Sequence, residues 1–108
     1  MKVKPAHLRE KASNDVDLVI EYYLSEANED IAMGFVDALE KGLNRIGRHP
    51  KSGSTFYAHE LNWPGLKSWP LKRYPYLVFY MEQPEHIDVI RVLHGQRDIP
   101  HWMREPEE

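Results

Sequence analysis

The sequence predicts an α+β fold in which an N-terminal strand and an antiparallel two-helix hairpin precede an antiparallel meander sheet that packs on the helices. Two observations lead to this fold class. Apolar residues recur at helical spacing up to about residue 49, and from Pro50 onward short β-prone runs alternate with turn residues. Since 108 residues with 42% hydrophobic content suit one core, we expect a single domain over residues 1–104 and a short acidic tail over residues 105–108.

The first half should contain a strand at residues 3–8 and then two helices. Asn28 is a suitable N-cap for the second helix, and Glu29 and Asp30 suit its positive first turn. Pro50 ends that helix because it lacks a backbone donor. Only about two residues separate the helices, so they must fold back as an antiparallel hairpin. The apolar stripes are Ala12, Val16, Val19, Ile20, Tyr23, Leu24 and Ala27 in the first helix, and Ile31, Phe35, Ala38, Leu39, Gly42, Leu43 and Ile46 in the second.

The second half is punctuated by Gly, Pro and Ser, which separate four predicted strands at residues 56–61, 66–71, 76–81 and 86–93. The third of these has apolar residues on both faces, so we expect it to be central in the sheet. In the last strand, strict alternation would place Arg91 on an otherwise apolar face with Ile87, Val89 and Leu93.

Composition excludes several classes of protein. The chain has no cysteine, so disulfides and thiolate metal sites are absent. Its histidines show no i, i+4 pair, and there is neither a phosphate-binding glycine loop nor a nucleophile elbow, so we expect no metal site and no cofactor. No export signal follows Met1 and no run of about 18 apolar residues is present, which predicts a cytoplasmic protein without a membrane span.

Charge is distributed unevenly along the chain. The net charge is -3, but residues 1–40 carry four Lys/Arg against nine Asp/Glu, residues 41–80 carry seven against one, and residues 81–108 carry three against seven. A basic middle between acidic ends suggests a positive face that could attract an acidic partner.

Several motifs occur in an order and spacing that together are specific. They are Ala12-x-x-Asp15-Val16-x-x-Val19-x-x-Tyr22, Pro50-x-Ser52-Gly53, Pro64-Gly65-Leu66-Lys67, Tyr76-Leu77-Val78-Phe79-Tyr80 and Arg91-Val92-Leu93-His94-Gly95-Gln96-Arg97-Asp98-Ile99. Over residues 3–103 the chain resembles the ParE toxins of the RelE/ParE superfamily. Lys67 departs from that family, which commonly has Arg after the Gly-Leu pair. Arginine can bind a carboxylate or phosphate through two hydrogen bonds at once, whereas lysine provides a point charge.

The resemblance implies the toxin of a type II toxin–antitoxin system, which binds DNA gyrase and blocks replication without being an enzyme. It also implies a ParD-like antitoxin that wraps the toxin in a hetero-oligomer. Neither membrane binding nor sequence-specific nucleic-acid binding is expected.

An alternative is a RelE-type, ribosome-dependent mRNA endoribonuclease, since those toxins share the fold. Phosphodiester cleavage needs a base, an acid and cations. At the positions where RelE-like proteins carry such groups this chain has Leu77, Ser68, Pro70 and a residue near Met103, and only Arg97 is kept. We therefore expect no catalytic residue.

His94 leaves two interpretations open. With Arg97, Asp98 and Tyr80 it could form a nuclease site of a different kind. The favoured interpretation is structural: His94 and Asp98 bracket a tight turn and satisfy free backbone groups, while Arg97 pairs with an acid.

Partner binding is the expected role of the remaining polar and aromatic residues. An antitoxin segment could add a strand beside residues 56–61 or occupy a groove between hairpin and sheet. The basic run Arg45, Arg48, Lys51, Lys67, Lys72 and Arg73 would attract an acidic peptide, although gyrase or DNA could meet it instead. A third hypothesis, suggested by the pI of 6.1, is an acidic interaction module without toxicity. The partner-binding candidates are Lys67, Trp69, Lys72, Arg73, Arg91, His94, Arg97 and Trp102.

Overall fold

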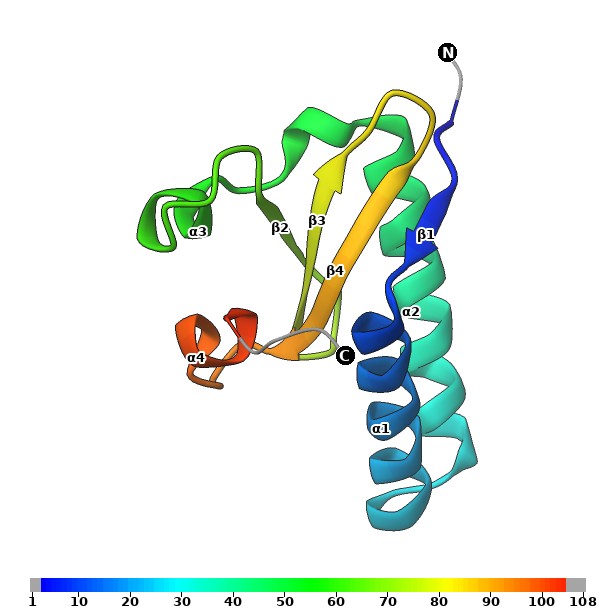
Figure 1. The fold of residues 1–108 in the computed structure, drawn as a ribbon. Helices are drawn as coiled ribbons and strands as arrows, with labels where there is room; N and C mark the ends of the chain where they lie inside the picture. The colour runs from blue at the N-terminus through cyan, green and yellow to red at the C-terminus, as the bar shows by residue number, and fades with distance from the viewer. Residues whose placement is uncertain (1–2, 105–108) are drawn as a thin grey trace.

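The computed structural model describes residues 3–104, so the predicted acidic tail at 105–108 lies outside the described residues. In Figure 1, the long helices α1 and α2 lie side by side along one side of the sheet, and the short helices α3 and α4 lie on the other. The elements in chain order are β1 (Ala6–Leu8), α1 (Glu10–Glu26), α2 (Glu29–Arg48), the 3-10 turn η1 (Pro50–Ser52), α3 (Phe56–Glu60), β2 (Lys67–Pro70), β3 (Tyr76–Glu82), β4 (Ile87–His94) and α4 (Ile99–Met103).

The α+β fold class predicted from the sequence is confirmed. The four strands form one sheet in the order β1-β4-β3-β2, so β3 is an interior strand as its two apolar faces predict. β2, β3 and β4 make the antiparallel meander, whereas β1 pairs with β4 in parallel. Among residues 3–104 no helix is long and apolar enough to cross a membrane.

The helical hairpin begins and ends where local signals predict. The Asn28 side chain accepts a hydrogen bond from the Ile31 amide, which satisfies one of the free donors in the first turn of α2. Arg45 and Arg48 occupy its last turn, where positive charge is favoured. The helix ends at Arg48, and Pro50 opens the 3-10 turn.

The expected strand at 56–61 is wrong, because this segment forms helix α3. The amide of Leu61 donates to the carbonyl of Tyr57, so the backbone is satisfied locally. Tyr57 and Leu61, four residues apart, both pack in the core on the α3 side of the sheet. This spacing is helical, and five residues are too short a window to separate it from strand alternation.

Two apolar clusters cover the two faces of the sheet. The first lies between the sheet and the long helices and is centred on Phe35, Ile46, Val78 and Tyr80. The second lies under α3 and α4. Its buried members are Leu61, Leu66, Phe79, Ile90, Leu93, Ile99 and Met103.

Strict alternation along β4 is also wrong beyond Val89. Ile87, Val89 and Val92 join the helix-side cluster, whereas Ile90 and Leu93 join the other. The cause is a register shift opposite Phe79 and Tyr80. A β-bulge inserts one extra residue and reverses the faces that follow it.

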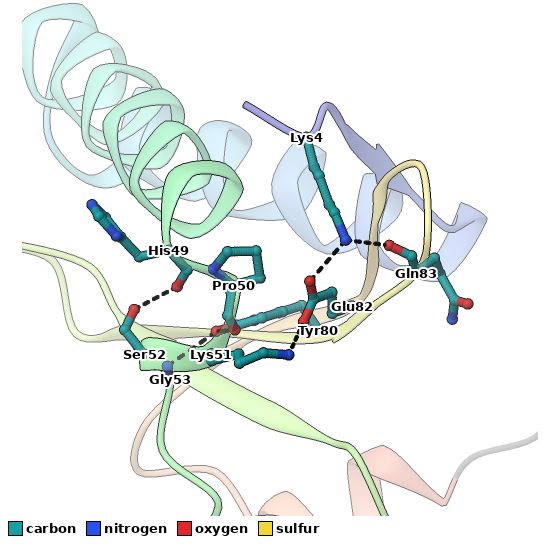
Figure 2. A network of polar contacts seen from close by, with 9 residues as sticks. All are labelled: Lys4, His49, Pro50, Lys51, Ser52, Gly53, Tyr80, Glu82 and Gln83. Carbon is teal, nitrogen blue, oxygen red and sulfur yellow. Dashed lines mark hydrogen bonds and ion pairs between the residues drawn. The ribbon is translucent and has the colours of Figure 1, made fainter. Parts of the chain in front are cut away.

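A polar network joins the end of α2 to β3 (Figure 2). The Tyr80 hydroxyl donates to the Pro50 carbonyl at 2.7 Å and accepts from the Gly53 amide at 3.1 Å. Nearby, the Glu82 carboxylate is bound by Lys4 at 2.7 Å and Lys51 at 3.1 Å. These contacts hold the chain against β3 where it leaves α2.

Candidate partner-binding site

Arg91 lies inside the protein and links three elements. The residue is 5% exposed. Its Nε and Nη2 donate to the two carboxylate oxygens of Asp15 at 2.8 Å each. Its Nη1 donates to the Trp102 carbonyl at 2.9 Å. The guanidinium therefore ties β4 to α1 and to α4, and it is not presented to solvent.

Asp15 was not identified as a functional residue from the sequence, although it belongs to the motif of the first helix. In the structure its Oδ2 also accepts from the Val92 amide at 3.0 Å. β1 reaches only Val89 along the edge of β4, so this carboxylate replaces the carbonyl that a longer β1 would provide. The sequence feature that could have identified this ion pair is a carboxylate on the apolar face of the first helix together with an arginine on an apolar strand.

The first groove, called here the α2 groove, separates helix α2 from the β2–β3 connection and has a volume of about 620 Å³. Gly34 and Gly42 on α2 admit side chains from the β2–β3 segment. A Cβ at Gly34 would collide with the Tyr74 hydroxyl, and one at Gly42 would lie 2.9 Å from Leu71 Cδ2. The lining residues are Gly34, Asp37, Ala38, Lys41, Gly42, Arg45, Trp69, Leu71, Lys72, Arg73 and Tyr74.

The second groove, the α1 groove, lies between helix α1 and the C-terminal segment and has a volume of about 720 Å³. Leu18 and Tyr22 on its α1 wall are 65% and 57% exposed. On the opposite wall the Arg97 guanidinium lies 4.6 Å from the centre of the Trp102 ring. Its lining residues are Asp15, Leu18, Val19, Tyr22, Tyr23, Pro75, Tyr76, Val92, Leu93, His94, Gln96, Arg97 and Trp102.

The structural interpretation of His94 and Asp98 is supported by their hydrogen bonds. His94 Nδ1 accepts from the Gln96 amide at 3.1 Å, and Asp98 Oδ1 accepts from the His101 amide at 3.3 Å at the start of α4. The expected acid partner of Arg97 is not found within residues 3–104, where its guanidinium lies over Trp102.

The alternative nuclease grouping of His94 with Tyr80 does not assemble. Tyr80 pairs with Val89, whereas the ring next to His94 is Tyr76, with centroids 5.2 Å apart. Tyr80 is fully buried with its hydroxyl already hydrogen-bonded, and burial raises its pKa. Burial also raises the pKa of Tyr76 to about 12, so this hydroxyl does not give up its proton near neutral pH.

The four positions that lack RelE-type groups are occupied by residues without ionisable side chains. Leu77 and Met103 pack in the apolar cluster under α3 and α4. Ser68 is buried and forms a β-bridge with Ser54, and Pro70 ends β2. Over the described part of the chain, no group of three or more potential metal ligands is present.

The structure separates most of the partner-binding candidates into two groups. Trp69, Lys72 and Arg73 line the α2 groove, whereas His94, Arg97 and Trp102 line the α1 groove. Lys67 on β2 and the buried Arg91 line neither. The α2 groove also includes Lys41, a residue that sequence reasoning did not single out.

A helical hairpin on a four-stranded sheet, with grooves on both sides of the hairpin, defines a small α+β protein of the RelE/ParE-like fold. A solved structure titled "Chromosomal ParDE TA system from P. aeruginosa" has this fold, with a TM-score of 0.71. It is 16% identical in sequence, and the match covers 85% of this chain and 96% of that one. Among curated proteins no match is found.

The family is established by a sequence comparison. The family model described as "ParE toxin of type II toxin-antitoxin system, parDE" matches residues 7–99. The chain therefore belongs to the ParE toxin family, and it is a ParE-type toxin of a type II toxin–antitoxin system.

Proposed function

We propose that this chain inhibits DNA gyrase by binding to it in the cytoplasm, that it cleaves no RNA, and that a ParD-like antitoxin neutralises it. Membership of the ParE toxin family supports gyrase as the target. The neighbour of known structure is a ParDE system, which supports a ParD-like partner and a hetero-oligomer of toxin and antitoxin.

The observation that carries the non-enzymatic part of the proposal is the apolar cluster under α3 and α4. Leu77 and Met103 lie there at positions where a RelE-type ribonuclease has polar groups. Arg97 remains as a cation, but arginine stays protonated at neutral pH and cannot act as acid and base in turn. Arg97 can therefore bind an anion, but it cannot move protons during cleavage.

In this proposal the contact with gyrase is made at the α1 groove. Exposed Leu18 and Tyr22 provide apolar area there, and Arg97 with Trp102 provides an aromatic and cationic wall. Aromatic residues and arginine often contribute most of the binding energy of an interface. Arg91 serves as a positioning residue, since it holds the Trp102 backbone from inside.

The test is a plasmid supercoiling assay with purified gyrase. Wild-type toxin should inhibit supercoiling, and Arg97→Ala should require roughly tenfold more protein for the same inhibition. Arg48→Ala, an exposed arginine outside both grooves, is the matched control and should inhibit like wild type. Folded wild-type protein that leaves gyrase fully active would refute the proposal.

The RelE-type alternative predicts codon-dependent mRNA cuts on translating ribosomes, abolished by Arg97→Ala. Primer extension on mRNA from expressing cells measures this directly. Intact mRNA together with halted replication supports gyrase inhibition. If expression without antitoxin is harmless, the chain is instead an acidic interaction module without toxicity.

A further inference from the structure

We infer that the α2 groove is the docking site for an acidic peptide segment that also carries apolar side chains. That this segment belongs to the antitoxin rests on the proposed function. The argument has three parts, which concern the charge of the groove walls, the chemistry of its floor and the β2 edge of the sheet beside it.

Four exposed cations flank the groove. Lys41 and Arg45, one turn apart on α2, form one wall, and Lys72 with Arg73 forms the other. Asp37 is the acidic residue among the lining residues, and the Lys41 ammonium already pairs with it at 3.0 Å. The chain as a whole carries a net charge of -3, so this groove has the opposite sign to the protein and would steer an acidic partner to itself.

The other basic residues of the middle segment lie outside the lining of the α2 groove. Lys51 is bound to Glu82 at 3.1 Å, as Figure 2 shows, and Lys67 and Arg48 lie outside the groove lining. Four of the seven Lys and Arg residues in residues 41–80 therefore line the α2 groove.

The floor of the groove favours a peptide over a nucleic acid. Ala38, Trp69 and Leu71 line it, and the Leu71 side chain packs against Gly42. The Arg45 guanidinium lies 5.8 Å from the Trp69 ring centre, so one wall residue is held against the floor. A phosphodiester backbone can use the cationic walls but has no apolar side chain for this floor, whereas an amphipathic acidic peptide uses both.

Strand addition, the other common mode of peptide binding, is hindered at the β2 edge of the sheet, which borders the α2 groove through Trp69. On β2 the amides and carbonyls of Ser54 and Ser68 bond each other at 2.9 and 3.0 Å, and Pro70 has no amide hydrogen. Next to this edge a partner peptide is therefore expected to bind through its side chains in the groove.

The experiment uses the full chain labelled with ¹⁵N and follows the indole N–H signals of its three tryptophans. Trp69 reports on the α2 groove, Trp102 on the α1 groove, and Trp63 lines neither. The probe is a synthetic peptide that alternates glutamate with leucine. We expect its addition to shift the Trp69 signal and to leave those of Trp63 and Trp102 in place. A peptide that alternates glutamate with glycine should bind more weakly, because it cannot fill the floor.

Charge variants provide the second measurement. Lys72→Glu should weaken the glutamate–leucine peptide by roughly fivefold, and added salt should weaken wild-type binding. Arg48→Glu makes the same change of charge on α2 outside the groove and should have little effect. Equal losses in both variants would mean that net charge alone attracts the peptide and would overturn the site.

Three further outcomes separate this inference from the proposed function. Duplex DNA that shifts Trp69 at a lower concentration than the peptide would make the groove a nucleic-acid site and overturn the inference. If the peptide does not shift the Trp69 signal of a chain that inhibits gyrase, the docking site is overturned and the proposed function is not. A Trp69 shift in a chain that leaves gyrase active supports the peptide site and overturns the proposed function.

Discussion

The buried ion pair between Asp15 and Arg91 makes the strongest prediction about stability. Asp15→Ala removes the acceptor of three hydrogen bonds, from Arg91 Nε, Arg91 Nη2 and the Val92 amide, and it leaves a guanidinium charge buried. Removing one partner of a buried pair costs about 3–5 kcal/mol, because the remaining charge stays buried after it loses that ion pair. We expect Asp15→Ala to lose stability in this range.

The expected shift in melting temperature follows from the size of the chain. An unfolding entropy of about 2.1 cal/mol/K per residue gives about 0.23 kcal/mol/K for 108 residues, so a loss of 3 kcal/mol lowers Tm by about 13 °C. Thermal unfolding followed by circular dichroism measures this shift. Asp17→Ala, an exposed carboxylate on the same helix, is the control and should change Tm by less than about 2 °C.

A double variant tests the reason for the loss. Asp15→Leu combined with Arg91→Met removes both charges, so it should recover much of the stability that Asp15→Ala loses. If Asp15→Ala lowers Tm no more than Asp17→Ala, the pair is not buried as described, and the argument that it holds α1 and α4 to β4 fails.

Three further predictions concern the polar network and the turns. Hydrogen bonds from Lys4 and then Lys51 lower the pKa of Glu82 below its usual 4.5, so its contribution to stability is present above pH 4.5 and is lost as the pH falls through the folded-state value. Urea unfolding at several pH values should show a weaker acid dependence in Glu82→Gln. Tyr80→Phe leaves the Pro50 carbonyl and the Gly53 amide without their partner and should cost about 1–3 kcal/mol in urea unfolding. Gly65→Ala, at a φ of 89°, should cost about 1 kcal/mol, measured in the same way.

Each of these has a contrary outcome. An unchanged acid dependence in Glu82→Gln would mean that the two lysines do not stabilise its carboxylate. Wild-type stability in Tyr80→Phe would mean that water replaces the hydroxyl without loss. Gly95→Ala, where the added Cβ would lie 3.7 Å from the Pro75 carbonyl oxygen and φ is not positive, is the control for Gly65, and equal losses would exclude backbone strain as the cause.

The long helices and the meander could be predicted from the sequence because their signals are local. Asn28 and Pro50 mark the ends of α2 within a few residues, and the apolar stripes need only neighbouring positions. Helix α3 could not be predicted in the same way, because five residues fit a strand as well as a helix. In the structure Ser54, just before this helix, bridges to the edge of β2.

The candidate site was predicted less completely, since it depends on contacts between distant segments. Turn residues His94 and Asp98 act on backbone groups two and three residues away, and their role follows from the local sequence. Arg91 finds its partner 76 positions away, on a helix that the sequence places only roughly. The bulge opposite Phe79 also changes which side the following β4 residues face, and it leaves no mark in the pattern of apolar residues.

The link between Asp15 and Val92 also constrains the order in which the chain can fold. Residues 77 apart must meet before α1 is anchored to the sheet, and closing so long a loop is entropically slow compared with forming the β3–β4 hairpin. During synthesis the first two helices leave the ribosome well before β4 exists, so their apolar face stays uncovered until the last fifth of the chain is made. We therefore expect fragments that end before residue 92 to aggregate or be degraded, and toxicity to require an almost complete chain.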